Sequence, residues 1–330
     1  MKKILITGSN GFIGSFLVEE ALKRNYEVYA GIRKTSNTEY LTDPRIKFIE
    51  LDFSNTDSLD LQLSELPCFD FVIHNAGTTK AFKKKDYFIS NYQYTKNIIK
   101  VLIGQKKVSK KFIYMSSLAA YGPGDPLQLN AVSSTDTPKP VTSYGKSKLE
   151  SEKYLCSLSE FPHIIIRPTV VYGPREKDLF TIFKLINNNL ELFVGFKNQH
   201  LTFIYVKDLV KAVFQTMESN VVNKGYFVSD GNVYDAQSLG DIIKNLLGKK
   251  TVRIYVPKSL ARVIALFSEA SKYLTRKQPV LNFDKVNELE CLNWKCDNKP
   301  LIDEFNFKSD YDLNRGISET IEWYKKSKWL

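Results

Sequence analysis

Cysteine and histidine are scarce in this chain, which limits the kinds of site that it can build. Its 330 residues include four cysteines and three histidines. No two cysteines have the CxxC spacing of a zinc or redox site, and the histidines lie far apart in the sequence. We therefore predict no metal centre, and cysteines that stay reduced, as is usual in the cytoplasm.

Long hydrophobic runs are also missing. The apolar run near the amino terminus, residues 4–7, is too short for the core of a signal peptide. The longest later run, residues 260–267, is far too short to span a bilayer. These absences predict a cytoplasmic protein that has no contact with a membrane.

Acidic residues are fewer than basic ones, 36 against 47, which gives a formal net charge of +11. A basic surface can bind nucleic acid or attract small anions, or it can simply be solvated. Here the basic residues occur in short, scattered groups with no aromatic stacking motif beside them. We therefore predict a solvated, lysine-rich surface and no nucleic-acid partner. The substrate expected from the motifs below is a small molecule.

What is present is a regular alternation of segments in the first half. Short apolar runs predict strands, and amphipathic segments between them predict helices. Such alternation predicts a doubly wound parallel Rossmann sheet, an α/β fold in which ligands gather beyond the carboxyl ends of the strands. The predicted strands are 4–7, 27–32, 45–50, 69–75, 111–116 and 163–167, and the predicted helices are 12–24, 58–65, 87–103 and 143–158.

The pattern becomes irregular after Pro168. We divide the chain into a dinucleotide-binding domain, residues 1–170, and a smaller substrate-binding portion, residues 171–330, with strands near 202–228 returning to the main sheet. A closing amphipathic helix is expected over 316–329, with Ile317, Ile321 and Tyr324 on one face. The other expected elements are helices at 179–189, 209–217, 239–247 and 260–273, and strands at 202–206 and 225–228.

A glycine-rich turn follows the first predicted strand and precedes the first predicted helix. Gly8 can make the tight turn, Gly11 leaves room for a pyrophosphate, and Gly14 allows close packing of helix and strand. The free N–H groups at the start of the helix would face the negative charge. This turn therefore predicts nucleotide binding by Gly8, Ser9, Asn10, Gly11, Phe12, Ile13 and Gly14.

Tyr144 and Lys148 are four residues apart on a predicted helix, and therefore lie on one face of it. The unperturbed pKa of a phenol, about 10, is too high for proton exchange at neutral pH. A neighbouring cation lowers the pKa of such a group by about one to three units. The pair is thus suited to transfer a proton during hydride chemistry.

In chain order, these motifs resemble those of the extended branch of the short-chain dehydrogenase/reductase superfamily, the NAD-dependent epimerase/dehydratase family. Further matches are His74-Asn75-Ala76-Gly77 and the segment from Arg167 to Pro174. The resemblance implies that Ser117, with Tyr144 and Lys148, is catalytic. Beyond the glycine turn, it implies cofactor contacts by Asp52, Phe53, Asn75, Ala76, Gly77, Asn91, Ser116, Tyr144, Lys148, Arg167, Pro168 and Val170.

The end of the second strand bears on the choice of cofactor. An acid at that position accepts hydrogen bonds from the adenosine ribose of NAD. This chain has Arg33-Lys34 instead, and Arg33 resembles the 2′-phosphate-binding arginine of dihydroflavonol reductases. We expect NADP(H) to be preferred, while NAD(H) stays possible because arginine can also stack on adenine.

Three functions are compatible with the sequence. The first is a reductase or dehydrogenase acting on a hydroxyl or carbonyl, as in dihydroflavonol reductases or 3β-hydroxysteroid dehydrogenases. The second is a nucleotide-sugar epimerase with bound NAD, in which Arg175 would hold a phosphate. The third is a non-catalytic relative that only binds the cofactor. Sugar dehydratases of this family usually carry Asp-Glu after the catalytic hydroxyl, where this chain has Leu118-Ala119, so dehydration is not expected.

Two further expectations follow from the resemblance. The helices that begin near Tyr87 and Ser143 match the pair that forms a dimer interface in many relatives, so a homodimer is expected. The substrate pocket would be lined by the irregular second half. Its candidate lining residues are Tyr121, Thr169, Phe180 and Phe203.

Overall fold

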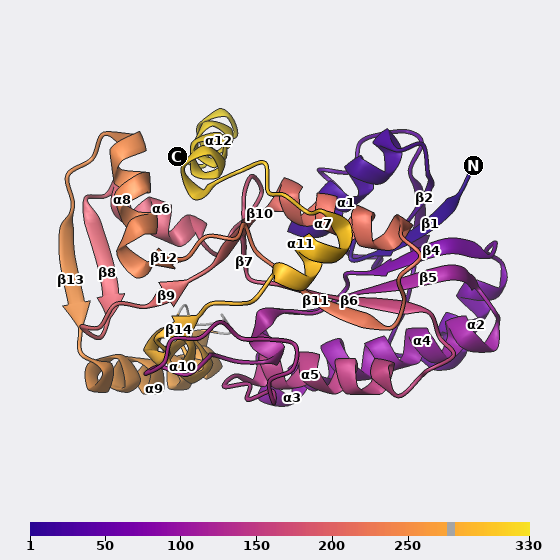
Figure 1. The fold of residues 1–330 in the computed structure, drawn as a ribbon, viewed down its shortest axis with the longest axis horizontal. Helices are drawn as coiled ribbons and strands as arrows, with labels where there is room; N and C mark the ends of the chain where they lie inside the picture. Colours follow the sequence, from indigo (N-terminus) through magenta and orange to yellow (C-terminus); the bar gives the residue numbers. More distant parts are fainter. Residues whose placement is uncertain (276–280) are drawn as a thin grey trace.

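The computed structural model describes residues 1–275 and 281–330 and is built around one seven-stranded parallel sheet (Figure 1). The strand order is β11-β6-β5-β4-β1-β2-β3, and every neighbouring pair in it is parallel. The predicted doubly wound α/β fold is therefore confirmed. The strands are β1 (Lys3–Thr7), β2 (Glu27–Ile32), β3 (Lys47–Glu50), β4 (Phe69–His74), β5 (Val108–Met115), β6 (His163–Pro168) and β11 (Lys224–Val228).

Successive residues of a strand point to opposite sides of the sheet, and here both sides are apolar. Helices therefore cover both faces. Ile4 and Ile6 of β1 pack on the side of α1 (Phe12–Lys23) and α7 (Val206–Glu218). Leu5 packs on the opposite side. That side is covered by α2 (Thr56–Ser64), α4 (Tyr94–Gly104) and α5 (Ser143–Cys156).

Three smaller sheets lie outside the main one. β10 (Phe203–Tyr205) pairs with β7 (Val170–Tyr172), so of the two strands expected near 202–228 only β11 is hydrogen-bonded into the large sheet. The return of the strand expected at 202–206 is therefore wrong. The remaining strands are β8 (Leu190–Val194) with β13 (Val252–Val256), and β9 (His200–Leu201) with β12 (Tyr234–Asp235) and β14 (Asn293–Trp294).

A separate hydrophobic core holds this second portion together. It includes Tyr172, Phe203 and Leu239, and the face of the last helix that carries Ile317, Ile321 and Tyr324. The closing helix thus has the expected buried face, although it begins and ends earlier than expected. The helices are α6 (Phe180–Asn187), α8 (Ala236–Leu247), α9 (Lys258–Thr275), α10 (Phe283–Glu290), α11 (Lys299–Phe305) and α12 (Leu313–Lys326).

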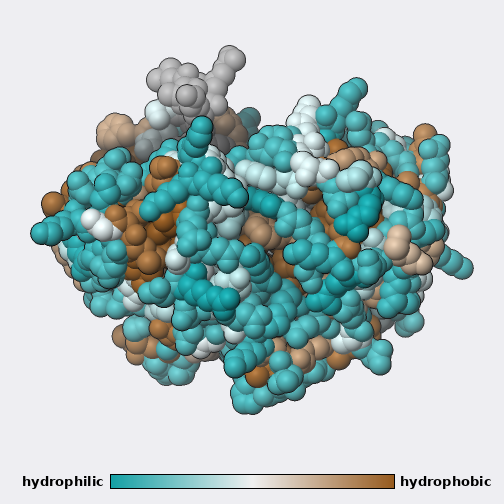
Figure 2. Space-filling model, turned by 90° about the horizontal axis from the view of Figure 1, so that it is seen from above, coloured by the Kyte–Doolittle hydropathy of each residue, from teal (hydrophilic) through white to brown (hydrophobic). Residues whose placement is uncertain are grey.

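The face of the molecule seen from above in Figure 2 is mainly polar. Brown, hydrophobic side chains gather on it towards the end that carries β8, β13, α6 and α8 (Figures 1 and 2). Among residues 1–275 and 281–330 no helix is both long and apolar enough to cross a membrane.

Candidate active site

The glycine turn joins β1 to α1 as expected. Gly8 has a φ of 65°, a conformation that favours glycine. A Cβ on Gly14 would strike the carbonyl oxygen of Gly8, so only glycine fits there. Gly11 is the N-cap of α1 and has no side-chain cap, which leaves the first N–H groups of the helix without a side-chain partner. These groups form an anion-binding cradle that fits a pyrophosphate.

The end of β4 lies directly against this turn. The Asn75 side chain donates to the Gly8 carbonyl oxygen at 3.3 Å, and the Ala76 N–H donates to the Thr7 hydroxyl at 3.1 Å. A Cβ on Gly77 would come within 3.4 Å of the Lys148 Nζ. The structure thus brings Asn75, Ala76 and Gly77 between the glycine turn and the predicted catalytic lysine.

His74, which the sequence analysis did not assign to the site, supports both strand ends. Its Nδ1 lies 2.9 Å from the Thr7 hydroxyl, and its Nε2 lies 3.0 Å from the Thr95 hydroxyl. Burial lowers the pKa of His74 to about 3, so the ring is neutral. In the sequence, Thr7 and His74 are each a polar residue at the end of an apolar strand. The structure shows that the two strands are neighbours and that these two residues lie opposite each other.

Tyr144 and Ser117 come together because two backbone segments approach each other closely. A Cβ on Gly145 would strike the Ala119 carbonyl oxygen, so this glycine lets the 3-10 turn η2 (Leu118–Ala120) pack against α5. Burial raises the pKa of Tyr144 to about 12, while its interaction with the Ser117 side chain acts to lower it. Both groups follow the carboxyl end of β5, where the fold places ligands.

Lys148 does not act on Tyr144 as expected. Its Nζ donates to the Met115 carbonyl oxygen at 2.7 Å and lies 4.9 Å from the centre of the Tyr114 ring. Burial lowers the pKa of Lys148 to about 8. The expected lowering of the Tyr144 pKa by this lysine is therefore wrong for the protein alone, because burial of the phenol has the larger effect.

Asn91 lies within the helical stretch that the sequence predicts over residues 87–103. It belongs to the π-helical turn η1 (Phe88–Gln93), which joins α3 (Lys84–Tyr87) to α4. Its side chain accepts from the Thr78 N–H at 2.7 Å and donates to the Ser147 hydroxyl at 2.9 Å. Asn91 therefore links the loop after Gly77 to α5, the helix of Tyr144 and Lys148.

Two residues predicted to contact the cofactor, Ser116 and Arg167, bind other residues of the protein instead. Arg167 forms a buried salt bridge with Glu152, 2.8 Å between the guanidinium and the carboxylate. The Ser116 hydroxyl donates to the same carboxylate, and its N–H donates to the Ile166 carbonyl oxygen. The polar protons of Ser116 and the charge of Arg167 thus have partners within the protein. Sequence reasoning missed Glu152, because nothing in the helix pattern marks it as buried.

Arg33, Asp52 and Phe53 follow the carboxyl ends of β2 and β3. Arg33 is exposed, and its N–H donates to the Ser36 hydroxyl. Asp52 is also exposed and accepts hydrogen bonds from the Ser54 N–H and hydroxyl, which lower its pKa. Phe53 lies edge-on to His74, with ring centres 5.8 Å apart. These residues extend the edge of the sheet beyond the glycine turn.

The remaining candidates lie past β6. Pro168 ends the buried β6, while Val170 is 38% exposed on β7. The Thr169 hydroxyl hydrogen-bonds to Thr202. The Arg175 guanidinium binds Ser15 and Glu19 of α1.

Two of the residues expected to line the substrate pocket pack in the second portion of the chain. Phe203 is 1% exposed in the core of the second portion, and Phe180 packs on Tyr324 and Trp329. Phe203 is therefore part of this core, while Phe180 is half-buried and stays a predicted substrate contact. Tyr121 lies against Phe227 and the Arg167 guanidinium, close to the Ser117 turn.

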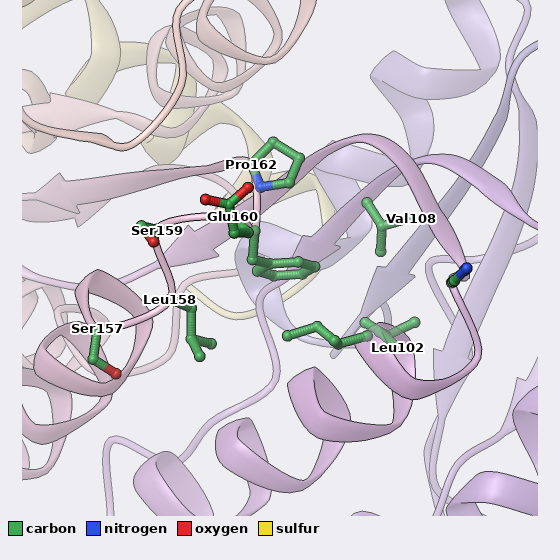
Figure 3. A pocket seen from close by; sticks show the side chains of 10 residues that line it. Leu102, Val108, Ser157, Leu158, Ser159, Glu160 and Pro162 are labelled. Atoms are coloured by element: carbon green, nitrogen blue, oxygen red, sulfur yellow. The ribbon is translucent and has the colours of Figure 1, made fainter.

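A pocket of about 450 Å³ is open at the other end of the sheet (Figure 3). Its walls come from the end of α4, the loop after α5 and the start of β5, with Leu102, Val108, Leu158 and Pro162 among them. These are the amino ends of β5 and β6, opposite to Ser117. The pocket is therefore separate from the candidate site. Among the described residues, no cluster of histidine, cysteine or carboxylate side chains could hold a metal ion.

Comparison with known proteins identifies the family. Residues 4–228 match the NAD dependent epimerase/dehydratase family, which is more than half of the chain. The chain belongs to this family. The resemblance inferred from the motifs is therefore confirmed, and the protein is an enzyme of the extended short-chain dehydrogenase/reductase type.

Individual members of the epimerase/dehydratase family resemble the whole chain. A UDP-glucose 4-epimerase from Vibrio cholerae is 28% identical and the match covers 89% of this chain and 90% of the relative. A ceramide reductase from Caulobacter vibrioides is 22% identical, with 99% and 96% covered. The crystal structure of dTDP-glucose 4,6-dehydratase from Bacillus anthracis, in complex with NAD, has a TM-score of 0.80 at 17% identity, with 100% and 98% covered, which shows a shared fold.

Proposed function

We propose that this protein transfers hydride between a nicotinamide cofactor and the hydroxyl or carbonyl carbon of a small molecule. The observation that carries the proposal is the meeting of Tyr144, Ser117 and Lys148 at the carboxyl edge of the sheet. The Ser117 side chain acts on the pKa of the Tyr144 phenol, and Lys148 lies beside Gly77, next to the glycine turn. A substrate oxygen at this edge would reach a proton donor and a second hydroxyl together.

The side chains have distinct roles in this proposal. The nicotinamide, when bound, supplies or accepts the hydride. In reduction Tyr144 gives its proton to the carbonyl oxygen of the substrate, and in oxidation it takes the hydroxyl proton back. Ser117 donates a hydrogen bond to the same oxygen. Lys148, held by the Met115 carbonyl oxygen, would present its charge to the cofactor ribose.

Replacing Tyr144 by phenylalanine tests these roles. We expect Tyr144→Phe to lower turnover by about a hundredfold to ten-thousandfold, because the proton donor is lost. Cofactor affinity, measured by fluorescence titration, should stay within about twofold, since the glycine turn is unchanged. Undiminished turnover in this variant would remove the tyrosine from the mechanism.

We propose that the preferred cofactor is NADP(H). The support is the exposed Arg33 at the end of β2, where no carboxylate would repel a 2′-phosphate. Arg33→Ala should weaken NADPH binding by at least about tenfold and leave NADH binding nearly unchanged. Arg45→Ala is the matched control, because Arg45 is also exposed but is paired with Asp43. Equal affinities for the two cofactors in the unaltered protein would contradict the preference.

A reductase or dehydrogenase is the reaction that the site favours. The epimerase alternative assigned Arg175 to a substrate phosphate, but this guanidinium is bound to Glu19 at 2.5 Å and to the Ser15 hydroxyl at 2.8 Å. In nucleotide-sugar enzymes that resemble this chain, an arginine that binds the substrate phosphate commonly precedes the strand corresponding to β10. This chain has His200-Leu201 at that place, which offers no fixed cation. The ceramide reductase among the relatives is compatible with this choice.

The second candidate is a nucleotide-sugar epimerase, favoured by the UDP-glucose 4-epimerase among the relatives. The two reactions treat the cofactor differently. An epimerase returns the hydride to its own substrate and keeps NAD bound, so cofactor should survive gel filtration. A reductase should be isolated with exchangeable cofactor and should consume NADPH when carbonyl compounds are added.

A further inference from the structure

Helix α9 carries its apolar side chains on the outside. Ala261 and Ala265 are fully buried against Val286 of α10, whereas five large apolar side chains between residues 260 and 267 are exposed. This is the reverse of an ordinary surface helix, whose apolar side faces the core. The exposed side chains are Leu260 (49%), Val263 (48%), Ile264 (41%), Leu266 (56%) and Phe267 (69%).

The neighbouring two-stranded sheet extends this apolar area. In β8 and β13, Leu190 pairs with Val252 and Leu192 with Ile254, and all four side chains are at least 36% exposed. The next pair, Val194 and Val256, packs against α9. Figure 1 shows α9 beneath the ends of these two strands. We call the five α9 side chains and these four strand residues the outer apolar surface.

The segment of the chain that carries β13 and α9 is mainly basic. Residues 249–271 include the basic residues Lys249, Lys250, Arg253, Lys258 and Arg262 and a single acid, Glu269. Arg253 and Arg262 are paired with carboxylates from other elements. Lys249, Lys250 and Lys258 form no salt bridge within residues 1–275 and 281–330. Apolar side chains flanked by lysines are the pattern of helices that lie in the plane of an anionic membrane.

We propose that the outer apolar surface docks on an anionic lipid bilayer, with α9 lying in the interface. A second copy of the chain fits less well, because a symmetric contact would bring the same lysines of both copies together. The lack of a spanning segment predicts no membrane contact. Docking needs no such segment, and the sequence does not show which side of α9 faces outwards.

The outer apolar surface lies one helix away from the candidate active site. α9 packs on α10, and the Asp284 carboxylate of α10 accepts the N–H of Ser143, the residue before Tyr144, at 2.9 Å. A docked protein therefore holds Tyr144 near the bilayer. On the proposed oxidoreductase function, the substrate class that follows is a hydroxyl or carbonyl compound with a long apolar chain held in the membrane.

Vesicle sedimentation tests the docking. We expect the full chain to sediment with vesicles of phosphatidylcholine and phosphatidylglycerol in equal amounts, and less with phosphatidylcholine alone or in high salt. The double variant Val263→Glu/Phe267→Glu should bind at least about tenfold more weakly. Leu61→Glu is the matched control, because Leu61 is 66% exposed on a helix of the other half and should leave binding unchanged.

Circular dichroism and NADPH titration on every variant show whether the fold is kept. Sedimentation of the double variant equal to that of the unaltered chain would overturn the docking, as would a failure of the unaltered chain to bind either vesicle. A dimer that the double substitution converts to monomer would also overturn it in favour of self-association. Docking without nicotinamide binding would instead contradict the proposed function and leave the docking standing.

Discussion

At the scale of single residues, burial shifts the two central groups of the site in opposite directions. The pKa of Tyr144 rises to about 12 and that of Lys148 falls to about 8, so that each group is pushed towards its neutral form. The phenol therefore keeps its proton at every physiological pH, as a donor must. The lysine is the group whose charge changes within the working range.

This difference predicts the pH dependence of carbonyl reduction. Lys148 is charged below about pH 8 and loses its proton above it, so its proposed support of the cofactor ribose is lost as pH rises. We expect kcat/KM to be level below about pH 8 and to fall above it. In Lys148→Arg the charge persists, so the fall should move to higher pH even if the rate is lower.

The measurement is kcat/KM of the purified protein with one carbonyl substrate across the pH range. The pH at which kcat/KM begins to fall is the quantity to compare between the two proteins. Circular dichroism at each pH separates loss of chemistry from loss of fold. The same falling limb in both proteins would show that another group sets it.

Sequence pattern found some of these residues and not others. Tyr144 and Lys148 were found because a four-residue interval on a helix is visible in the sequence. Glu152 and His74 were missed, since a lone polar residue is informative only when its partner is known. Their partners, Arg167 and Thr7, are 15 and 67 residues away in the chain.

At the scale of elements, the Glu152 carboxylate ties three of them together. It lies on α5, receives the Ser116 hydroxyl from just after β5, and pairs with Arg167 on β6. Because the site is built from the ends of these elements, the pair fixes their spacing. Its loss would leave the buried Arg167 charge without a counter-ion.

We predict that Glu152→Gln lowers the free energy of unfolding by about 3–5 kcal/mol in urea. Glu150→Gln is the control on the same helix, because Glu150 forms an exposed pair with Lys153 and should cost less than about 1 kcal/mol. Similar losses in the two variants would mean that the buried pair contributes no more than a surface one.

Element prediction succeeded where periodicity is strong and failed where tertiary contacts decide. The buried strands of the main sheet read as continuous apolar runs and were placed correctly. The strand at Phe203–Tyr205 has the same character, and only its pairing with Val170–Tyr172 shows that it lies outside the main sheet. The π-helical turn at Asn91 has no sequence signal of its own.

At the scale of the whole molecule, the expected division at residue 170 follows the helix and strand rhythm. Three elements from beyond residue 170 nevertheless belong to the main sheet and its cover. β11 lies at the edge of the sheet, and α7 and α11 cover one of its faces. We propose that the first domain together with these later elements binds the cofactor. The rest of the second portion is then left to bind the substrate.

We also expect a homodimer formed through α4 and α5. Exposed Ile89 and Ile103, 42% and 41%, lie at the two ends of the stretch from η1 to α4. Light scattering at micromolar concentration should give twice the chain mass of 37.9 kDa. The double variant Ile89→Glu/Ile103→Glu should give the mass of a single chain. It leaves the outer apolar surface unchanged, so the two surfaces are tested separately. A monomer in the unaltered protein would end this expectation.

The exposure of Arg33 has a consequence for how such a protein can evolve. Its side chain lies in solvent, and the turn beneath it is held by a backbone N–H, so substitutions there should change stability by less than about 0.5 kcal/mol. Gly14 has no such freedom, because any side chain would collide with Gly8. On the proposed role of Arg33, a change at this one codon would alter which dinucleotide the protein prefers, while the close approach of Gly14 to Gly8 keeps the turn itself unchanged.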